Sequence, residues 1–237
     1  MVLNSFKSLG SDAGYYWTVI SKGYSSFGSF SPAEPDVRFL KDGRNVMLLV
    51  DLVYTDPDGV KWSVPKGQDG GSVFNGASIP TIFWNTVGSP WTGQYRNASL
   101  VHDYYCQNHL RPWRDVHRMF YYGCLAGGVR PSRAKIMFAA VFAQGPRWEY
   151  RQPDGSTSET WRPSIAESQV PPVRHPELLE SLKPADERGL AEAKPSGDVE
   201  NWVPNISSDQ VADINRWIHK TSPSIQNIED EIDRRSH

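Results

Sequence analysis

Three consecutive helical patterns between about residues 95 and 145 constrain the fold of this chain more than any other part of its sequence. The first runs from about Tyr95 to Gln107, and the second from about Trp113 to Ala126, where Gly127-Gly128 is a typical helix end. Pro131 then opens a third, strongly apolar helix. Because the connections are short, we expect the first two helices to form an antiparallel hairpin within a three-helix unit.

A pattern of short strands precedes the helices. The apolar run Val46–Tyr54, the turn Thr55–Gly59 and the alternating segment Val60–Val64 together predict a β-hairpin. Short strands followed by a run of helices are typical of an α+β fold rather than of a parallel sheet. We therefore expect a hairpin or small antiparallel sheet from about residues 37–64, packed on the three-helix unit, with a partly irregular C-terminal extension.

Composition divides the chain into four stretches. Residues 1–36 are rich in glycine, serine and aromatic residues and predict an irregular segment, whereas residues 37–148 hold the expected core domain. Residues 149–206 are linker-like and are expected to be partly disordered. Residues 207–237 contain two amphipathic helical patterns, which we expect to dock on the core, with binding of a protein partner as the alternative.

Charge and hydropathy argue against nucleic-acid binding and against a membrane-spanning helix. The 237 residues carry a formal net charge of −2, so the chain lacks the strong positive field that nucleic acid requires. No apolar run approaches the roughly 20 residues of a membrane-spanning helix. The first residues, Met1–Lys7, do not have the basic-then-apolar layout of a Sec signal, so we expect synthesis in the cytosol.

The two cysteines of the chain, Cys106 and Cys124, lie on the first and second predicted helices. In an antiparallel hairpin their offset along the helix axis is about 10–15 Å, at roughly 1.5 Å rise per residue. That offset exceeds the roughly 7 Å between Cα atoms that a disulfide can bridge. We therefore expect two free thiols that serve as small core residues.

The candidate functional residues are His102, Asp103 and His117. His102 and Asp103 place an imidazole beside a carboxylate on an aromatic-rich helix, and His117 lies on the apolar stripe of the next helix. A helical hairpin would bring the three side chains together. One interpretation is a catalytic or metal-binding centre, and the other is a buried polar network that fixes the packing of the hairpin.

An ordered series of motifs over about residues 45–145 resembles a phage-associated family, domain-of-unknown-function family 1353. The motifs are Val64-Pro65, Asn75-Gly76-Ala77-Ser78-Ile79-Pro80, Ile82-Phe83-Trp84, Gly88-Ser89-Pro90, Gly93, Tyr95, His102-Asp103-Tyr104 and Arg118-Met119-Phe120. The chain departs from the usual family pattern at Asn75, Cys106 and His117, where the family has Asp, Tyr and Asp. The resemblance implies phage association, but the function of the family is unassigned.

The His102-Asp103 hairpin is also similar to the active site of secreted phospholipases of the A-two class. That resemblance implies that His102 is the general base and Asp103 a calcium ligand. His117 stands where those enzymes have a carboxylate that orients the base. The glycine-rich calcium loop and the disulfides of those enzymes are absent from this sequence.

A different divalent metal is the alternative to calcium. Two imidazoles and one carboxylate, from His102, His117 and Asp103, suit zinc or another transition metal better than calcium. The segment containing Asn75 and Ser78, together with Tyr105, is expected to line the site. Ser78 is a further candidate nucleophile, although Ala-Ser-Ile-Pro is not a glycine-flanked nucleophile elbow.

Two functions follow from these residues. The first is a hydrolase of phage or phage-like delivery origin that acts on ester or amide bonds of lipid or the cell envelope. The second is a non-catalytic component of a virion or delivery apparatus in which the His-Asp network is structural. Either protein would be virion-associated or delivered by a secretion apparatus without a Sec signal. An open cleft at His102 would favour the enzyme, and full burial the scaffold.

Overall fold

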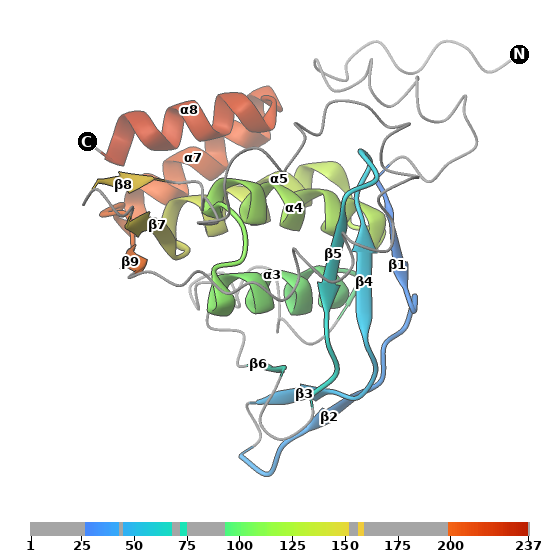
Figure 1. Cartoon of the computed structure of the whole chain (residues 1–237). Helices are drawn as coiled ribbons and strands as arrows, with labels where there is room; N and C mark the ends of the chain where they lie inside the picture. The colour runs from blue at the N-terminus through green and yellow to red at the C-terminus, as the bar shows by residue number, and fades with distance from the viewer. Residues whose placement is uncertain are drawn as a thin grey trace, which may run out of the picture.

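A computed structural model describes residues 27–42, 45–67, 72–74, 93–151, 156–158 and 199–236. The described residues form the expected α+β fold, in which small antiparallel sheets lie beside a three-helix unit and two C-terminal helices pack on that unit (Figure 1). Residues Asn75 and Ser78 lie outside the described part of the chain, as does most of the predicted irregular segment 1–36.

The three predicted helices are present with nearly the expected bounds. They are α3 (Arg96–Asn108), α4 (Trp113–Ala126) and α5 (Pro131–Gln144). Helix α3 is followed by its C-cap residue His109, which adopts a left-handed conformation at φ 52° and donates its backbone N–H to the carbonyl of Tyr105. Pro112 directly precedes α4 and Pro131 occupies the first turn of α5, where a missing N–H costs no helical hydrogen bond.

The predicted β-hairpin is confirmed between β4 (Leu52–Thr55) and β5 (Lys61–Val64). Asp56 closes its turn, because Oδ1 accepts hydrogen bonds from the backbone N–H groups of Asp58 and Val60. The strand β1 (Ser29–Ser31) pairs with the other edge of β4. One face of β4 and β5 is buried, and β5 contacts α3.

The apolar run Val46–Tyr54 does not form the single strand that was expected. It splits into β3 (Val46–Leu48) and β4, and β3 joins a second sheet between β2 (Val37–Phe39) and β6 (Val73–Phe74). The backbone partners change at the break: Leu49 donates to the carbonyl of Asp36, whereas Leu52 already lies opposite Val64 in the first sheet. Hydropathy alone does not reveal this change because both halves of the run face the core.

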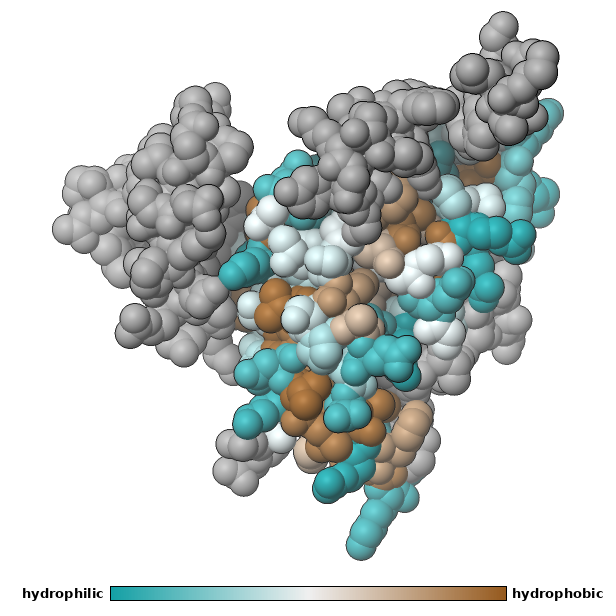
Figure 2. Space-filling model, turned by 90° about the vertical axis from the view of Figure 1, so that its right-hand side faces the viewer, coloured by the Kyte–Doolittle hydropathy of each residue, from teal (hydrophilic) through white to brown (hydrophobic). Residues whose placement is uncertain are grey.

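Two of the exposed large hydrophobic residues are Phe39 on β2 and Leu49, which directly follows β3. Figure 2 shows hydrophobic side chains at the lower end of the molecule, at the height that β2 and β3 occupy in Figure 1. Charged and polar residues are interspersed among them. Scattered exposure of this kind is ordinary for a protein surface.

A third sheet lies partly within the segment predicted to be linker-like. Its strands are β7 (Arg147–Arg151), β8 (Thr157–Ser158) and β9 (Val199–Trp202), with β7 in the centre. Strand β7 buries Trp148 and Tyr150. Strand β9 is largely exposed and is held in the sheet by backbone pairing with β7. Both ends of the segment expected to be linker-like thus contribute strands to this sheet, and residues 152–155 and 159–198 lie outside the described part.

The C-terminal helices α7 (Ser208–Thr221) and α8 (Ile225–Ser236) both contact α5, so docking on the core is confirmed. Ser207 caps α7 in a capping box with Gln210. The apolar faces of both helices are buried, including Ile214 on α7 and Ile228 on α8. No helix in the described ranges has the length and apolar character that crossing a membrane requires.

Candidate metal centre

The hairpin of α3 and α4 brings His102 and His117 into direct contact. Nε2 of His102 lies 2.8 Å from Nδ1 of His117, and both residues are fully buried. The short connection between the two helices sets this register, since α3 ends at Asn108 and α4 begins at Trp113. The predicted juxtaposition of His102 and His117 is therefore present.

Cys106 is the third member of the cluster. It lies one turn after His102 on α3, so both side chains project from the same face of the helix. Its Sγ atom is 3.6 Å from Nε2 of His102, and potential ligand atoms of His102, Cys106 and His117 all lie within 4.8 Å of one another. From its sequence Cys106 was expected to be a small core residue, although its i, i+4 spacing from His102 was a usable signal.

Asp103 and Tyr105 occupy other positions than the sequence analysis expected. Asp103 is fully buried but does not belong to the group of potential ligands, because neighbouring residues on a helix diverge by about 100°. The hydroxyl of Tyr105 accepts a hydrogen bond from the backbone N–H of Ser63, so Tyr105 ties α3 to β5. The structure therefore assembles a His-Cys-His group in place of the predicted His-Asp-His group.

Burial keeps both imidazoles neutral. Desolvation lowers the pKa of His102 to about 3. Desolvation also lowers the pKa of His117, and the nearby charges of Arg147 and Arg114 lower it further, while the carbonyl of Pro146 acts in the opposite direction. A neutral imidazole has one nitrogen with a free lone pair, which is the form that binds a metal ion.

The walls of the centre are aromatic and tightly packed. The ring of Phe120 lies 4.9 Å from that of His102, and the ring of Trp113 lies 5.6 Å from that of His117. Gly145 allows the start of β7 to approach, since a Cβ atom there would lie 3.1 Å from Cε1 of His117. Within the described residues, the geometric criteria give no hydrogen bond to the buried atoms Nε2 of His117 and Nε1 of Trp113.

The spacing of the three side chains can be compared with tetrahedral zinc. Zinc–sulfur and zinc–nitrogen bonds of about 2.3 and 2.1 Å place the sulfur and nitrogen ligands about 3.6 Å apart, which matches the separation of Cys106 and His102. Two nitrogen ligands would be about 3.4 Å apart, so the 2.8 Å contact between His102 and His117 would have to widen by about half an ångström.

The part of the chain that carries the centre matches a known family. Residues 46–141 match the model of a family described as "Protein of unknown function (DUF1353)". This range runs from β3 to within α5 and contains all three side chains of the centre.

Two proteins of Sinorhizobium fredii are similar to this chain. Uncharacterized protein y4iH is 42% identical over 112 residues, and uncharacterized protein y4jT is 42% identical over 123 residues. The alignments cover 47% and 52% of this chain but only 45% and 35% of the two relatives, so the chain spans less than half the length of each. No solved structure matches the chain. None of these descriptions states an activity.

Proposed function

We propose that the chain binds a zinc-class transition metal ion through His102, Cys106 and His117 and that it is a metal-dependent hydrolase. The observation that carries the proposal is the convergence of two neutral imidazoles and one thiol, from two adjacent helices, within 4.8 Å of one another. This donor set consists of nitrogen and sulfur. Calcium, which takes six to eight oxygen ligands, does not fit it, whereas zinc and related metals do.

The hydrolytic part of the proposal rests on the number of ligands. Catalytic zinc sites have three protein ligands and keep a fourth position for water or substrate, whereas structural sites have four. When bound in such a site, zinc lowers the pKa of water to near 7 and supplies a nucleophile at neutral pH. We propose ester or amide bonds of lipid or the cell envelope as the substrate, and phage-like delivery as the setting, from the two resemblances described above.

A second candidate function is supported by one specific observation. His102, Asp103 and His117 are each 0% exposed, which is what a structural polar network inside a non-catalytic virion or delivery component would show. In that case the His102–His117 hydrogen bond stabilises the α3–α4 hairpin and no metal is required. Metal content separates this candidate from the first.

The test is the metal content of the protein as purified and after zinc reconstitution, measured by mass spectrometry. We expect one ion per chain in the wild type and none in His102→Ala or Cys106→Ala. The matched control is Cys124→Ala, because Cys124 is equally buried but lies outside the centre. Circular dichroism establishes that each variant is folded.

Activity is then measured on phospholipid and peptidoglycan substrates with and without the metal. Hydrolysis that disappears in folded His102→Ala supports the enzyme. If the wild type holds no metal and hydrolyses neither substrate, and His102→Ala unfolds, the structural function is correct and the hydrolase is excluded.

A further inference from the structure

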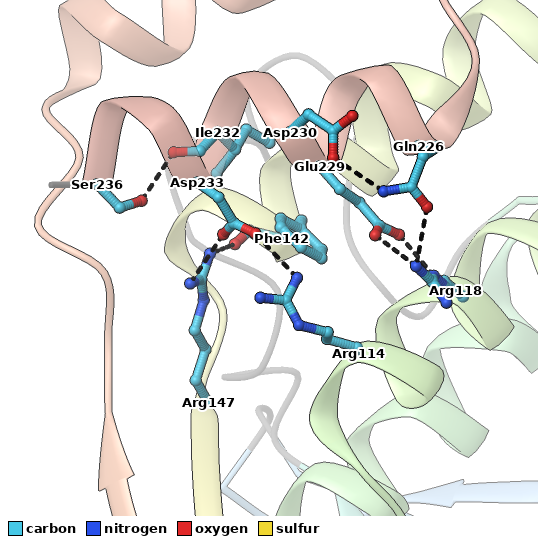
Figure 3. A network of polar contacts seen from close by, with 10 residues as sticks. All are labelled: Arg114, Arg118, Phe142, Arg147, Gln226, Glu229, Asp230, Ile232, Asp233 and Ser236. Atoms are coloured by element: carbon cyan, nitrogen blue, oxygen red, sulfur yellow. Dashed lines mark hydrogen bonds and ion pairs between the residues drawn. The ribbon is translucent and has the colours of Figure 1, made fainter. Parts of the chain in front are cut away.

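Helix α8 is held to α4 and to the start of β7 by a network of charged side chains (Figure 3). Arg118 on α4 makes a bidentate contact to Glu229, with both N–O distances 2.6 Å. Asp233, one turn further along α8, bridges Arg114 at 3.0 Å and Arg147 at 3.3 Å. Three guanidinium groups therefore face two carboxylates across this contact.

Arg114 and Arg147, the two arginines bridged by Asp233, contact a side chain that in turn contacts the centre. The guanidinium groups of Arg114 and Arg147 lie 4.4 and 4.3 Å from the ring of Trp113. The same ring lies edge-on to His117, 5.6 Å away. Asp233, the two arginines, Trp113 and His117 thus form one continuous stack from the surface to the centre.

Two buried polar atoms lie on this side of the centre. Within the described part of the chain, Nε1 of Trp113 and Nε2 of His117 are buried and make no hydrogen bond. Buried polar groups normally have a partner, and an exception needs a physical explanation. Opening of this wall to water or to a ligand would supply the missing partners.

The attachment of α8 is suited to release. Only Ser222, Pro223 and Ser224 connect it to α7, and Ser222 has a φ of 46°, a conformation that non-glycine residues seldom adopt. Its ion pairs weaken in salt and are open to competition by another anion. The buried side chains of Ile228 and Ile232 favour the docked state in the absence of such a competitor.

We propose that α8 is a removable strap on the Trp113 side of the centre, and that a phosphate group of the substrate displaces its carboxylates from Arg114, Arg118 and Arg147. The guanidinium group binds phosphate and carboxylate with the same planar, two-pronged geometry. Glu229 and Asp233 thus occupy positions that phosphate oxygens would take. The substrate class depends on the proposed function, but the movement of α8 can be tested without metal or activity.

The test is the rate at which a thiol reagent labels Cys106 in the folded, metal-free full-length protein, in a Cys124→Ala background. We expect the double variant Glu229→Gln/Asp233→Asn to label at least ten times faster than the wild type. The matched control is Asp209→Asn/Asp213→Asn, which removes two carboxylates from exposed positions on α7. Its labelling rate should be unchanged.

A charge-reversed variant covers the case in which loss of charge alone does not release α8. Glu229→Arg/Asp233→Arg places like charges opposite the three arginines and must detach the helix, which hydrogen exchange of the α8 amides verifies. If α8 is detached and Cys106 still labels at the wild-type rate, the strap is excluded. Metal content, measured separately, then still decides the proposed metal centre.

The ligand is tested with inorganic phosphate and with phosphatidylglycerol vesicles, each at constant ionic strength against chloride. Faster labelling of the wild type with either probe, and not of Arg114→Gln, supports displacement by phosphate. Acceleration by phosphate alone indicates a soluble substrate, and acceleration by vesicles alone indicates a lipid headgroup. If neither probe accelerates labelling, α8 is not displaced by phosphate.

Discussion

Nε2 of His102 lies 2.8 Å from Nδ1 of His117, and neither imidazole has exposed surface. Because burial keeps both rings neutral, one ring donates a hydrogen bond and the other accepts it. Insertion of a metal ion would replace that shared proton, with Cys106 as the third ligand. Without metal the two imidazoles thus share a hydrogen bond, and with metal they would supply two of its three protein ligands.

Substitution His117→Asp should separate the two proposed chemistries. Aspartate has a shorter side chain than histidine and offers oxygen in place of nitrogen as the ligand atom. We therefore expect zinc affinity to fall at least tenfold in a competition titration. A centre of the phospholipase type would instead retain its hydrolytic activity, because a carboxylate orients His102. His219→Asp, an exposed site on α7, should change neither quantity.

The metal-free protein should lose stability as the pH falls from about 6.5 towards about 3. In this range the unfolded chain protonates His102 and the folded chain does not, so protons favour unfolding. Each such histidine contributes a slope of about 1.4 kcal/mol per pH unit. Urea unfolding between pH 4 and 7 measures this slope, and folded His102→Gln should show a smaller one. An identical slope in both proteins would contradict the assigned burial of a neutral His102.

The Arg118–Glu229 pair should stabilise the docked α8 far more than an exposed ion pair does. The side chain of Glu229 is only 2% exposed, so Arg118→Ala leaves a buried carboxylate without its bidentate partner. We expect a loss of about 3 kcal/mol in the free energy of unfolding, near the lower limit for such pairs because Arg118 itself is 37% exposed. Arg216→Ala, which breaks an exposed pair with Asp213, should cost about 0.5 kcal/mol or less.

Both cysteines should react with a thiol reagent when the unreduced protein is denatured. The structure confirms the expectation that Cys106 and Cys124 are free. In the folded protein Cys124 should react slowly, because burial raises the pKa of its thiol and excludes the reagent. Titration with a chromogenic disulfide reagent, with and without denaturant, counts the thiols. A requirement for reductant would show that they are bridged.

The helical unit could be predicted closely because its signals are local. Pro112 and Pro131 mark the starts of α4 and α5, and Gly127 follows the last residue of α4. The strands were harder to predict because pairing is not local. The apolar run from Val46 to Tyr54 has one pattern of hydropathy but supplies strands to two sheets, and β9 finds its partner β7 about fifty residues away along the chain.

The same distinction applies to the centre. The sequence by itself determined that His102 and His117 lie on adjacent, apolar helices, since periodicity and helix-end signals fix both positions. The tertiary structure decided that Cys106 joins them and that Asp103 does not, because the packing of α3 against α4 sets which face of α3 meets His117. It also decided where α8 docks, since the pairing of Glu229 and Asp233 with arginines more than eighty residues away depends on packing that no local pattern encodes.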